Sequence, residues 1–396
     1  MTGHVLVLNA GSSSLKFAVY SDGGANDWKL ASRGQVEGIG GAAALSVRDA
    51  EGRQLAEEAL GPRAGDGRAA LEIVIDWLRK AHAGAQLLGV GHRVVHGGPR
   101  HAGPARVTPE LISDLRKLVP LAPLHQPHNL AAIETVAARA PEVPQVACFD
   151  TSFHRGQPVV AELIPLPREL RETGLQRYGF HGLSYEYVAS VLPSVAPEIA
   201  GGRVIVAHLG SGASMCALSA GRSVDSTLGF TALDGLCMGT RPGSVDPGVI
   251  LYLFQTLGLP ATEVEDILYR RSGLLGISGL SNDMRNLLAS TEPAARLAID
   301  YFVYRAAKEL GALAAVLGGI DGLVFTAGIG ERSAEIRARI CKASAWLGID
   351  LDAEANLRHG PVITRKGSAV PVWVVPTNEE LMIARHTLRL LRGAAA

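Results

Sequence analysis

The side chains best suited to chemistry stand in glycine-rich segments that follow apolar runs. Arg93 lies in HRVVHGG (residues 92–98) and Arg241 in MGTRPGSVDP (residues 238–247). A guanidinium fork captures a carboxylate or a phosphate with two parallel hydrogen bonds. Two such arginines, one from each half of the chain, would clamp a transferring phosphoryl group and stabilise the charge on its equatorial oxygens. For either arginine taken alone, a surface ion pair is the alternative.

Two histidines stand in similar segments. His181 follows Tyr178-Gly179-Phe180 and precedes a glycine. An imidazole beside a phosphoryl group can donate a hydrogen bond in the transition state, and a structural histidine is the alternative. His125, in PLHQPH (residues 123–128), is a comparable candidate. The alternative for His125 is a loop that scaffolds a following helix capped by Asn129.

Two acidic residues complete the set. Asp150 ends the apolar run 143–149. In an open α/β sheet the carboxyl end of a strand is the usual ligand position, although aspartate is also a preferred helix cap. Glu379 follows Asn378 at the start of the last predicted helix, where an acidic residue also suits the helix dipole. Its functional interpretation is a Mg²⁺ ligand, because magnesium in phosphoryl-transfer sites takes one or two carboxylates plus phosphate oxygens.

Two glycine–serine turns between apolar runs predict a pair of hairpins. NAGSSSLK (residues 9–16) joins the runs 5–8 and 17–20, and HLGSGAS (residues 208–214) repeats the scheme. Glycine permits close backbone approach, and hydroxyls beside a lysine can donate to phosphate oxygens. One such turn is explained equally well as an ordinary serine-rich hairpin. Two, each opening one half of the chain, favour a duplicated nucleotide-binding fold.

Two further segments have the composition of a nucleotide site. FTAGIGE (residues 325–331) follows a predicted strand and opens a helix, but it lacks the full spacing of a dinucleotide-binding motif. Its glycines would let an adenosine lie flat against the backbone. GLSNDMR (residues 279–285) could supply a carboxylate for ribose or amine and an arginine against the base. A solvated turn is the alternative for the second segment.

Composition narrows the class of protein. The 396 residues predict two domains, and 38 basic against 38 acidic residues leave no electrostatic footprint for nucleic acid or an anionic membrane. The cysteines lack metal-ligand spacing, which favours four reduced thiols in a cytoplasmic protein. The start of the chain lacks a charged region followed by a long apolar region, so a signal peptide is not expected. The most apolar helical run, 301–317, is interrupted by charges and is expected in the core.

Hydrophobic periodicity then predicts the elements that position these residues. Helices are expected at 69–82, after Thr108-Pro109, within 245–269, over 301–317 and at the end of the chain. Strands are expected at 87–91, 143–149, 322–325 and 372–375, and the proline-rich run 158–167 is expected to connect the halves. His92 and Arg93 are expected to follow their strand. The predicted architecture is two α/β halves that face a cleft.

The motifs VLNAGSSSLK (residues 7–16) and GHRVVHGG (residues 91–98) carry a specific resemblance. Over essentially its whole length the chain resembles the acetokinase family, within the acetate and sugar kinase/Hsp70/actin superfamily. The resemblance implies an α/β fold of two duplicated actin-like, ribonuclease H-like domains. Residues 1–150 would form the acyl-substrate domain, with the helix 381–396 packing back on it. Residues 151–380 would form the nucleotide-binding and dimerisation domain.

The resemblance also implies an activity and a set of site residues. The activity is reversible, Mg²⁺-dependent transfer of the ATP γ-phosphate to acetate, giving acetyl phosphate and ADP, with Mn²⁺ as an alternative metal and a homodimer as the assembly. Asn9 and Glu379 would bind the metal, and Lys16 the nucleotide phosphates. Asp150 would be the acid/base position, and His181 and Arg241 would stabilise the transition state. The acyl substrate would contact Arg93, Val95, Leu124, His125, Phe180 and Ala232. The nucleotide would contact His208, Leu209, Gly210, Ser211, Gly212, Asp283, Met284, Arg285, Gly328, Ile329, Gly330, Glu331 and Arg332.

Several positions depart from the family pattern. Ser211 and Arg332 replace asparagines, and Pro242 and Ser244 flank Arg241 where serine and aspartate are usual. Ala232 replaces a proline in the acyl pocket, which predicts a roomier pocket. The charged positions are retained, so we interpret these changes as tuning.

Direct in-line transfer is the expected mechanism, because a carboxylate acceptor is already ionised at neutral pH and needs no general base. Asp150 would then orient Arg241, water or metal. A kinase for propionate or butyrate is the nearest rival function. A non-catalytic, ATP-dependent switch is less consistent with retention of Arg93, His181, Arg241 and Glu379.

Overall fold

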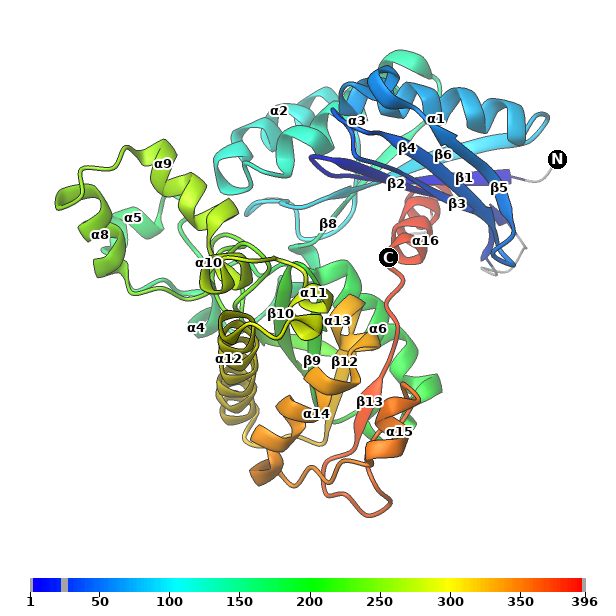
Figure 1. The fold of residues 1–396 in the computed structure, drawn as a ribbon. Coiled ribbons are helices and arrows are strands. Elements are labelled where there is room, and N and C mark those ends of the chain that lie inside the picture. Colours follow the sequence, from blue (N-terminus) through cyan, green and yellow to red (C-terminus); the bar gives the residue numbers. More distant parts are fainter. Residues whose placement is uncertain (1–2, 23–27, 394–396) are drawn as a thin grey trace. The chain divides into compact units, whose positions relative to one another are not determined.

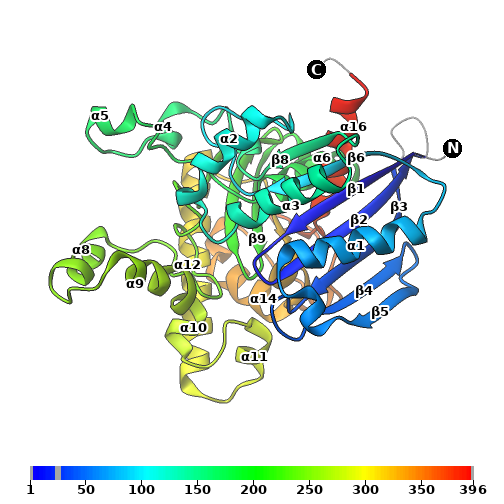
Figure 2. The ribbon, with the colours of Figure 1, turned by 90° about the horizontal axis from the view of Figure 1, so that it is seen from above.

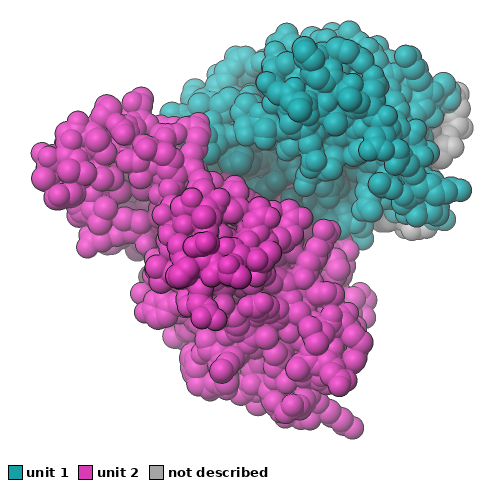
Figure 3. Space-filling model, in the orientation of Figure 1, with its two compact units in different colours: residues 1–153, 378–396 teal, residues 154–377 magenta. Residues whose placement is uncertain are grey.

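The computed structural model describes residues 3–22 and 28–393. The chain forms two compact units, which Figure 3 colours separately. Unit 1 comprises residues 1–153 together with 378–396, and unit 2 comprises residues 154–377. Among the described residues, no helix has the length and apolar character needed to cross a membrane.

Unit 1 is built on a mixed sheet with the strand order β5-β4-β3-β2-β1-β6-β8-β7. β1, β6 and β8 are parallel neighbours, so their carboxyl ends lie at one edge of the sheet. β2, β3, β4 and β5 continue the sheet as an antiparallel meander. The strands are β1 (Gly3–Ala10), β2 (Ser14–Asp22), β3 (Trp28–Glu37), β4 (Ala44–Asp49), β5 (Gln54–Ala59), β6 (Gln86–Val94), β7 (Ala105–Arg106) and β8 (Gln145–Phe149).

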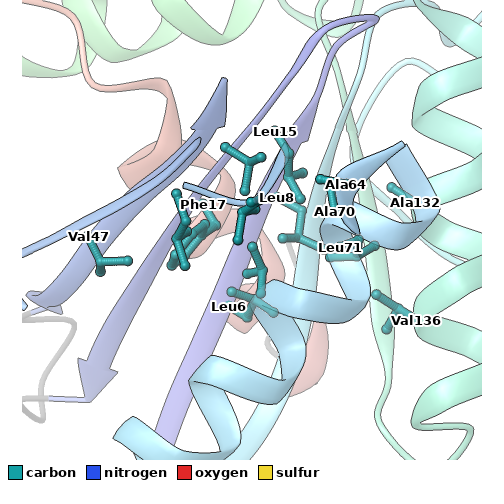
Figure 4. Close-up of a cluster of buried hydrophobic side chains, with 14 of the residues drawn as sticks. Leu6, Leu8, Leu15, Phe17, Val47, Ala64, Ala70, Leu71, Ala132 and Val136 are labelled. Carbon is teal, nitrogen blue, oxygen red and sulfur yellow. The ribbon is translucent and has the colours of Figure 1, made fainter. Parts of the chain in front are cut away.

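Helices cover both faces of this sheet (Figure 1). α1 (Gly67–Ala81) and α3 (Gln126–Arg139) pack on one face, with α2 (Pro109–Lys117) beside α3. α1 begins where Asp66 accepts a hydrogen bond from the amide of Ala69, and α2 begins at the predicted Thr108 cap. Leu71 and Val74 of α1 join Leu8 and Phe17 of the sheet in the buried cluster of Figure 4.

α16 (Glu379–Leu391), the last described helix of the chain, packs on β1, β6 and β8 of unit 1. Two glycines of β6 make this close approach possible. A Cβ at Gly89 would overlap the side chain of Leu391, and a Cβ at Gly91 would overlap Thr387 and Ile383. The carboxyl-terminal helix therefore completes a sheet whose strands all precede residue 150.

Unit 2 contains a five-stranded sheet in the order β11-β10-β9-β12-β13. Its strands are β9 (Arg203–Leu209), β10 (Ala213–Ser219), β11 (Arg222–Ser226), β12 (Gly322–Thr326) and β13 (Val372–Val374). Its helices are α4 (Val159–Glu162), α5 (Arg168–Arg171), α6 (Gly182–Val195), α7 (Pro197–Ala200), α8 (Pro247–Gln255), α9 (Ala261–Asp266), α10 (Gly273–Ser278), α11 (Met284–Ala289), α12 (Pro293–Leu317), α13 (Ala327–Arg332), α14 (Ala334–Ala343) and α15 (Ala353–Leu357). α12 is the core helix predicted over 301–317, and it ends at Gly318 in the left-handed conformation.

The two sheets repeat one topology, which confirms the duplicated α/β fold. In unit 1 the central order is β3-β2-β1-β6-β8, and in unit 2 it is β11-β10-β9-β12-β13. In each, a three-stranded antiparallel meander is followed by two strands parallel to its first strand. Both predicted glycine–serine turns join the first two strands of their meanders.

Two elements of unit 2 stand apart from its sheet. α8 and α9 lie away from β9 to β13 in both ribbon views (Figures 1 and 2). α8 falls within the helical block predicted at 245–269. The proline-rich run 158–167, predicted to be irregular, contains the short helix α4.

Candidate functional site

The hairpin β1–β2 places Asn9 and Lys16 directly opposite each other near the turn. The turn is closed by a hydrogen bond from the amide of Gly11 to the carbonyl oxygen of Ser14 (2.8 Å). Directly opposed residues of an antiparallel pair project from the same face. Asn9 and Lys16, predicted to contact metal and phosphate, therefore share one face of the unit 1 sheet.

Arg93 lies within β6 and not in a loop after it, which corrects the prediction that the strand ends at Gly91. β6 runs to Val94 and pairs with β1 on one side and β8 on the other. The pairing places Arg93 opposite Cys148, two residues before Asp150. Parallel strands thus bring Arg93 and Asp150 to the same edge of the sheet.

Asp150 binds Arg93 in a two-point ion pair. Nη2 of Arg93 lies 2.7 Å from Oδ2 of Asp150, and Nε lies 3.1 Å from both carboxylate oxygens. The Asp150 side chain is 2 % exposed and that of Arg93 is 20 % exposed. Burial raises the pKa of Asp150 to about 6, against the opposing charge and hydrogen bonds of Arg93. Burial would lower the pKa of Arg93, but the charges of Asp150 and Glu379 hold it above its ordinary value.

The two predicted metal ligands face the same nitrogen of Arg93. Nη1 lies 3.5 Å from Oδ1 of Asn9 and 3.7 Å from Oε2 of Glu379. Asn378 caps α16 by accepting from the amide of Leu381, which fixes Glu379 in the first helical turn. Within the described part of the chain no three His, Cys, Asp or Glu side chains form a metal cluster. An amide oxygen and a carboxylate nevertheless suit Mg²⁺, which completes its shell with phosphate oxygens and water.

The loop after β6 is positioned by Asn129, for which the sequence predicted a different role. Asn129 was expected to cap a helix, but α3 begins three residues earlier, with Pro127 in its first turn. The Asn129 side chain instead accepts from the amide of Val95 (3.0 Å) and donates to the carbonyl oxygen of Ala10 (2.9 Å). Asn129 therefore ties the predicted acyl-pocket residue Val95 to the end of β1. Leu124 and His125, the other unit 1 candidates for this pocket, directly precede α3 and are half-buried.

In unit 2 the predicted phosphate turn is the hairpin β9–β10. His208 pairs with Ser214, and residues 210–212 form the turn, with the amide of Gly210 donating to the carbonyl oxygen of Gly212 (3.0 Å). Ser211 is exposed at its tip, and the Leu209 side chain is buried in the core. Leu209 can therefore offer a ligand only its backbone.

The segment before α6 brings His181 against this hairpin. His181 precedes α6 with φ 58°, in the left-handed region, and its ring stacks on that of His208 with centroids 4.2 Å apart. Phe180 is buried, and its carbonyl oxygen lies 2.9 Å from Nε2 of His154. Burial lowers the pKa of His154 to about 4, so this imidazole is neutral at pH 7.

Arg241 lies in a compact loop of unit 2. Its Nη1 donates to the carbonyl oxygen of Ala232 (3.0 Å), and its own carbonyl oxygen accepts from the amide of Met238 (3.0 Å). Gly273 packs so closely on this loop that a Cβ there would overlap backbone atoms of Met238 and Arg241. Arg241 and Ala232, one predicted catalytic and the other an acyl-pocket residue, are therefore direct neighbours.

Some predicted nucleotide residues have structural partners of their own. Asp283 caps α11, and its carboxylate is bound by the guanidinium of Arg285. Glu331 accepts from the amides of Ala327 (2.9 Å) and Thr377 (3.1 Å), so it joins α13 to the segment after β13. Met284 and Gly330 are buried, whereas Gly328 and Arg332 are exposed and Ile329 lies at intermediate depth. The contact of these residues with a nucleotide stays a prediction.

Hydroxyl groups around His181 and His208 were missed by sequence reasoning. Ser214 Oγ lies 2.7 Å from Nδ1 of His181 and 2.5 Å from the phenol oxygen of Tyr185, and Ser184 Oγ lies 2.8 Å from Nδ1 of His208. The pairing of His208 with Ser214 follows from the hairpin register. Nothing in the sequence links Tyr185 and Ser184 to these imidazoles.

Comparisons with known proteins cover almost the whole chain. Residues 4–385 match the model of the acetokinase family. An acetate kinase of Nitrobacter hamburgensis is 54% identical over 388 residues, covering 98% of this chain and 96% of the relative. An acetate kinase of Rhizobium meliloti is 51% identical over 393 residues, covering 99% of both.

Two solved structures share the fold at lower identity. A propionate kinase of Francisella tularensis superposes with a TM-score of 0.90 at 35% identity, covering 98% of this chain and 99% of that one. A Porphyromonas gingivalis acetate kinase superposes with a TM-score of 0.85 at 36% identity, covering 98% and 100% of the two chains.

Proposed function

Because the chain belongs to the acetokinase family, we propose that it transfers the γ-phosphoryl group of ATP reversibly and in line to the carboxylate of acetate. The products are acetyl phosphate and ADP. The enzyme class is that of a phosphotransferase with a carboxyl acceptor, and ATP is the family's co-substrate. The observation that carries the assignment is identity of about one half to acetate kinases over nearly the full chain.

Arg93 is the proposed anchor of the acyl substrate. Acetate is ionised at neutral pH and needs no general base, so the site must orient it and stabilise charge. The two-point ion pair with Asp150 restrains the Arg93 guanidinium in one plane. Asp150 is therefore proposed as a positioning residue that acts through Arg93, its partner in unit 1. The sequence-based prediction was that Asp150 orients Arg241, water or metal, and it stays untested.

Asn9 and Glu379 are the proposed holders of Mg²⁺, with Mn²⁺ as an alternative. Their oxygens face one nitrogen of Arg93, which supports a shared ligand position. A bound divalent cation would neutralise phosphate oxygens during transfer. Lys16 is proposed to contact the nucleotide phosphates from the opposed strand position.

Unit 2 supplies the proposed nucleotide contacts and two stabilisers of the transferring group. The turn 210–212, Asp283 to Arg285 and Gly328 to Arg332 are proposed to line the nucleotide. His181 and Arg241 are proposed to donate to the phosphoryl oxygens as negative charge is redistributed. The support is positional: His181 lies against the turn, and Arg241 lies beside Ala232 of the proposed acyl pocket.

A propionate kinase is the second candidate. The support is the fold shared with the Francisella protein and the alanine at position 232. Formation of acyl phosphate from ATP with acetate, propionate and butyrate, assayed side by side, tests both candidates. Higher kcat/KM for acetate supports the first, and higher kcat/KM for propionate replaces it with the second. No acyl phosphate from any of the three acids would reject both.

A homodimer is the proposed assembly, and α8 is its proposed contact. Val249 to Phe254 are six consecutive apolar residues, yet no residue of α8 is buried. A helix that is apolar all round is normally covered by protein. Two valines of α4 are also exposed, Val159 at 72 % and Val160 at 79 %.

Light scattering of the purified chain tests the dimer. We expect a dimer for the wild type and a monomer for Leu251→Asp. Leu357→Asp, which changes an exposed leucine on α15, should remain a dimer. A monomeric wild type would reject the proposal.

A cytoplasmic location is proposed from the cysteines. All four lie within the described residues, are buried and form no disulfide there, and reduced thiols persist in the cytoplasm.

A further inference from the structure

Two imidazoles stack beside the phosphate turn of unit 2. The rings of His181 and His208 are 4.2 Å apart and inclined by 15°. A Cβ built on Gly212 would lie 3.2 Å from Nε2 of His181, and one built on Gly210 would lie 4.0 Å from Nε2 of His208. Both Nε2 atoms therefore face the turn 210–212, where a side chain in place of either glycine would come against them.

The opposite nitrogen of each ring is held by a buried hydroxyl. Nδ1 of His181 lies 2.7 Å from Oγ of Ser214, and Nδ1 of His208 lies 2.8 Å from Oγ of Ser184. Ser214 Oγ is also 2.5 Å from the phenol of Tyr185. All three hydroxyl-bearing residues are fully buried. A neutral imidazole has one donor and one acceptor nitrogen, and the partner of one nitrogen sets the role of the other.

The direction of the hydrogen bonds follows from Tyr185. In the part of the chain that the structure describes, its phenol bonds only to Ser214, and a buried hydroxyl that fails to donate costs about 1–3 kcal/mol. Burial raises the pKa of Tyr185 well above its ordinary value, so the phenol keeps its proton. Tyr185 therefore donates to Ser214, and Ser214 directs its own proton to Nδ1 of His181. Nδ1 is then an acceptor, which leaves the ring proton on Nε2.

The same argument applies to His208. Across the described residues, the hydroxyl of Ser184 bonds only to Nδ1 of His208. Donation by Ser184 makes Nδ1 an acceptor and places the proton of His208 on Nε2. Two stacked imidazolium ions would also repel each other at this separation, which favours neutral rings.

We propose that Ser214 with Tyr185, and Ser184 separately, are positioning residues that set the tautomers of His181 and His208. Each imidazole then presents an Nε2–H donor to the turn 210–212. Two neighbouring donors suit an anionic phosphoryl group, whose identity rests on the proposed function. The hydroxyls touch no ligand themselves and act through the imidazoles.

Nitrogen-15 NMR of the full chain labelled at histidine tests the proposal without any substrate. The signals of His181 and His208 are assigned from His181→Asn and His208→Asn among the 12 histidines. We expect both rings in the Nε2–H form. A proton on Nδ1 of either ring in the wild type would overturn the assignment for that ring, whether or not any variant folds.

Variants separate the two hydroxyl systems. Tyr185→Phe should convert His181 to a mixture of tautomers and leave His208 unchanged, and Ser184→Ala should do the reverse. Tyr187→Phe, which removes a phenol from the same helix, is the matched control and should change neither ring. Tyr185→Phe should also lower kcat about tenfold, the equivalent of one lost hydrogen bond, with KM for ATP nearly unchanged. An unchanged His181 tautomer in a folded Tyr185→Phe variant would reject the proposal.

The outcomes separate this proposal from the proposed function. Nε2–H rings in a protein that makes no acyl phosphate would reject the function and keep the tautomer assignment. Nδ1–H rings in an active acetate kinase would do the opposite.

Discussion

The hairpins that open the two units have one topology and different electrostatics. Near the turn, β1–β2 pairs Asn9 with Lys16, and β9–β10 pairs His208 with Ser214. In unit 1 the strand β6 places the Arg93 guanidinium between the carboxylates of Asp150, which follows β8, and Glu379 of α16. In unit 2 the adjacent helix brings hydroxyls to two stacked imidazoles.

The difference shows two ways to hold a donor rigid. Arg93 is fixed by charge, so its orientation depends on the buried carboxylate of Asp150. His181 is fixed by neutral hydrogen bonds, so its orientation depends on proton positions in Ser214 and Tyr185. The two units thus hold their donors by ionic and by neutral contacts, and the following changes test that contrast.

Loss of Arg241 should have the largest effect, because it is the one cation of unit 2 that we assign to catalysis. Arg241→Ala should lower kcat by roughly 10³-fold with little change in KM for ATP, because a transition-state donor is lost. Steady-state kinetics measure both constants. Arg365→Ala, at an exposed ion pair with Asp350, is the control and should match the wild type. A near-normal kcat for Arg241→Ala would show that neutral donors suffice in unit 2.

Loss of Arg93 tests the ionic site. Arg93→Ala leaves the Asp150 carboxylate buried without its partner, so the free energy of unfolding should fall by about 3 kcal/mol. Adding Asp150→Ala should recover part of this loss, and the double-mutant cycle gives the coupling. Arg168→Ala, at the exposed pair with Glu172, should cost under about 1 kcal/mol. Equal losses for Arg93→Ala and Arg168→Ala would mean that burial adds nothing to the Arg93 pair.

Both units should lose stability in acid through buried histidines. Burial lowers the pKa of His92 in unit 1 and of His154 in unit 2 to about 4, below the unfolded value near 6.5. The unfolded chain therefore binds more protons between these values. The contribution of each histidine to stability should be constant above pH 6.5 and should fall towards pH 4 by about 1.4 kcal/mol per pH unit. Denaturant melts of His92→Gln and His154→Gln should each show a shallower slope, and an unchanged slope would contradict the assignment.

Ala232 should have the smallest effect. Ala232→Pro should narrow the proposed acyl pocket and lower the propionate-to-acetate ratio of kcat/KM by about threefold, because one methylene gives limited discrimination. Kinetics with both acids measure the ratio. An unchanged or higher ratio would remove Ala232 from the specificity determinants.

Short-range sequence patterns predicted the two glycine–serine turns correctly, but they predicted too early an end for the strand β6. The glycine–serine turns, the Thr108 cap and the core helix of unit 2 follow from short-range patterns, and all are present. Arg93 was assigned to a loop because histidines and paired glycines surround it. Pairing with strands on both sides keeps it in β6, and such pairing depends on residues far along the chain.

The predictions for the candidate site also divide into residues that local sequence indicates and residues that it does not. Arg93, Asp150, Asn9 and Glu379 could be nominated from residue type and position, and the sheet brings them together. The roles of Asn129, Tyr185 and Ser184 could not, because each acts through a contact with a distant segment. The prediction that Asn129 caps a helix was wrong because α3 begins three residues earlier, with Pro127 in its first turn.

The position of α16 in the chain has a consequence for biosynthesis. Unit 1 has all its strands by residue 149, yet the face of β6 at Gly89 and Gly91 stays uncovered until α16 emerges, after the whole of unit 2. Domains otherwise tend to fold in order of synthesis. Because Glu379 belongs to that helix, the metal site that we propose cannot assemble on a nascent or prematurely terminated chain. Completion of the proposed metal site is thereby coupled to prior synthesis of the whole of unit 2.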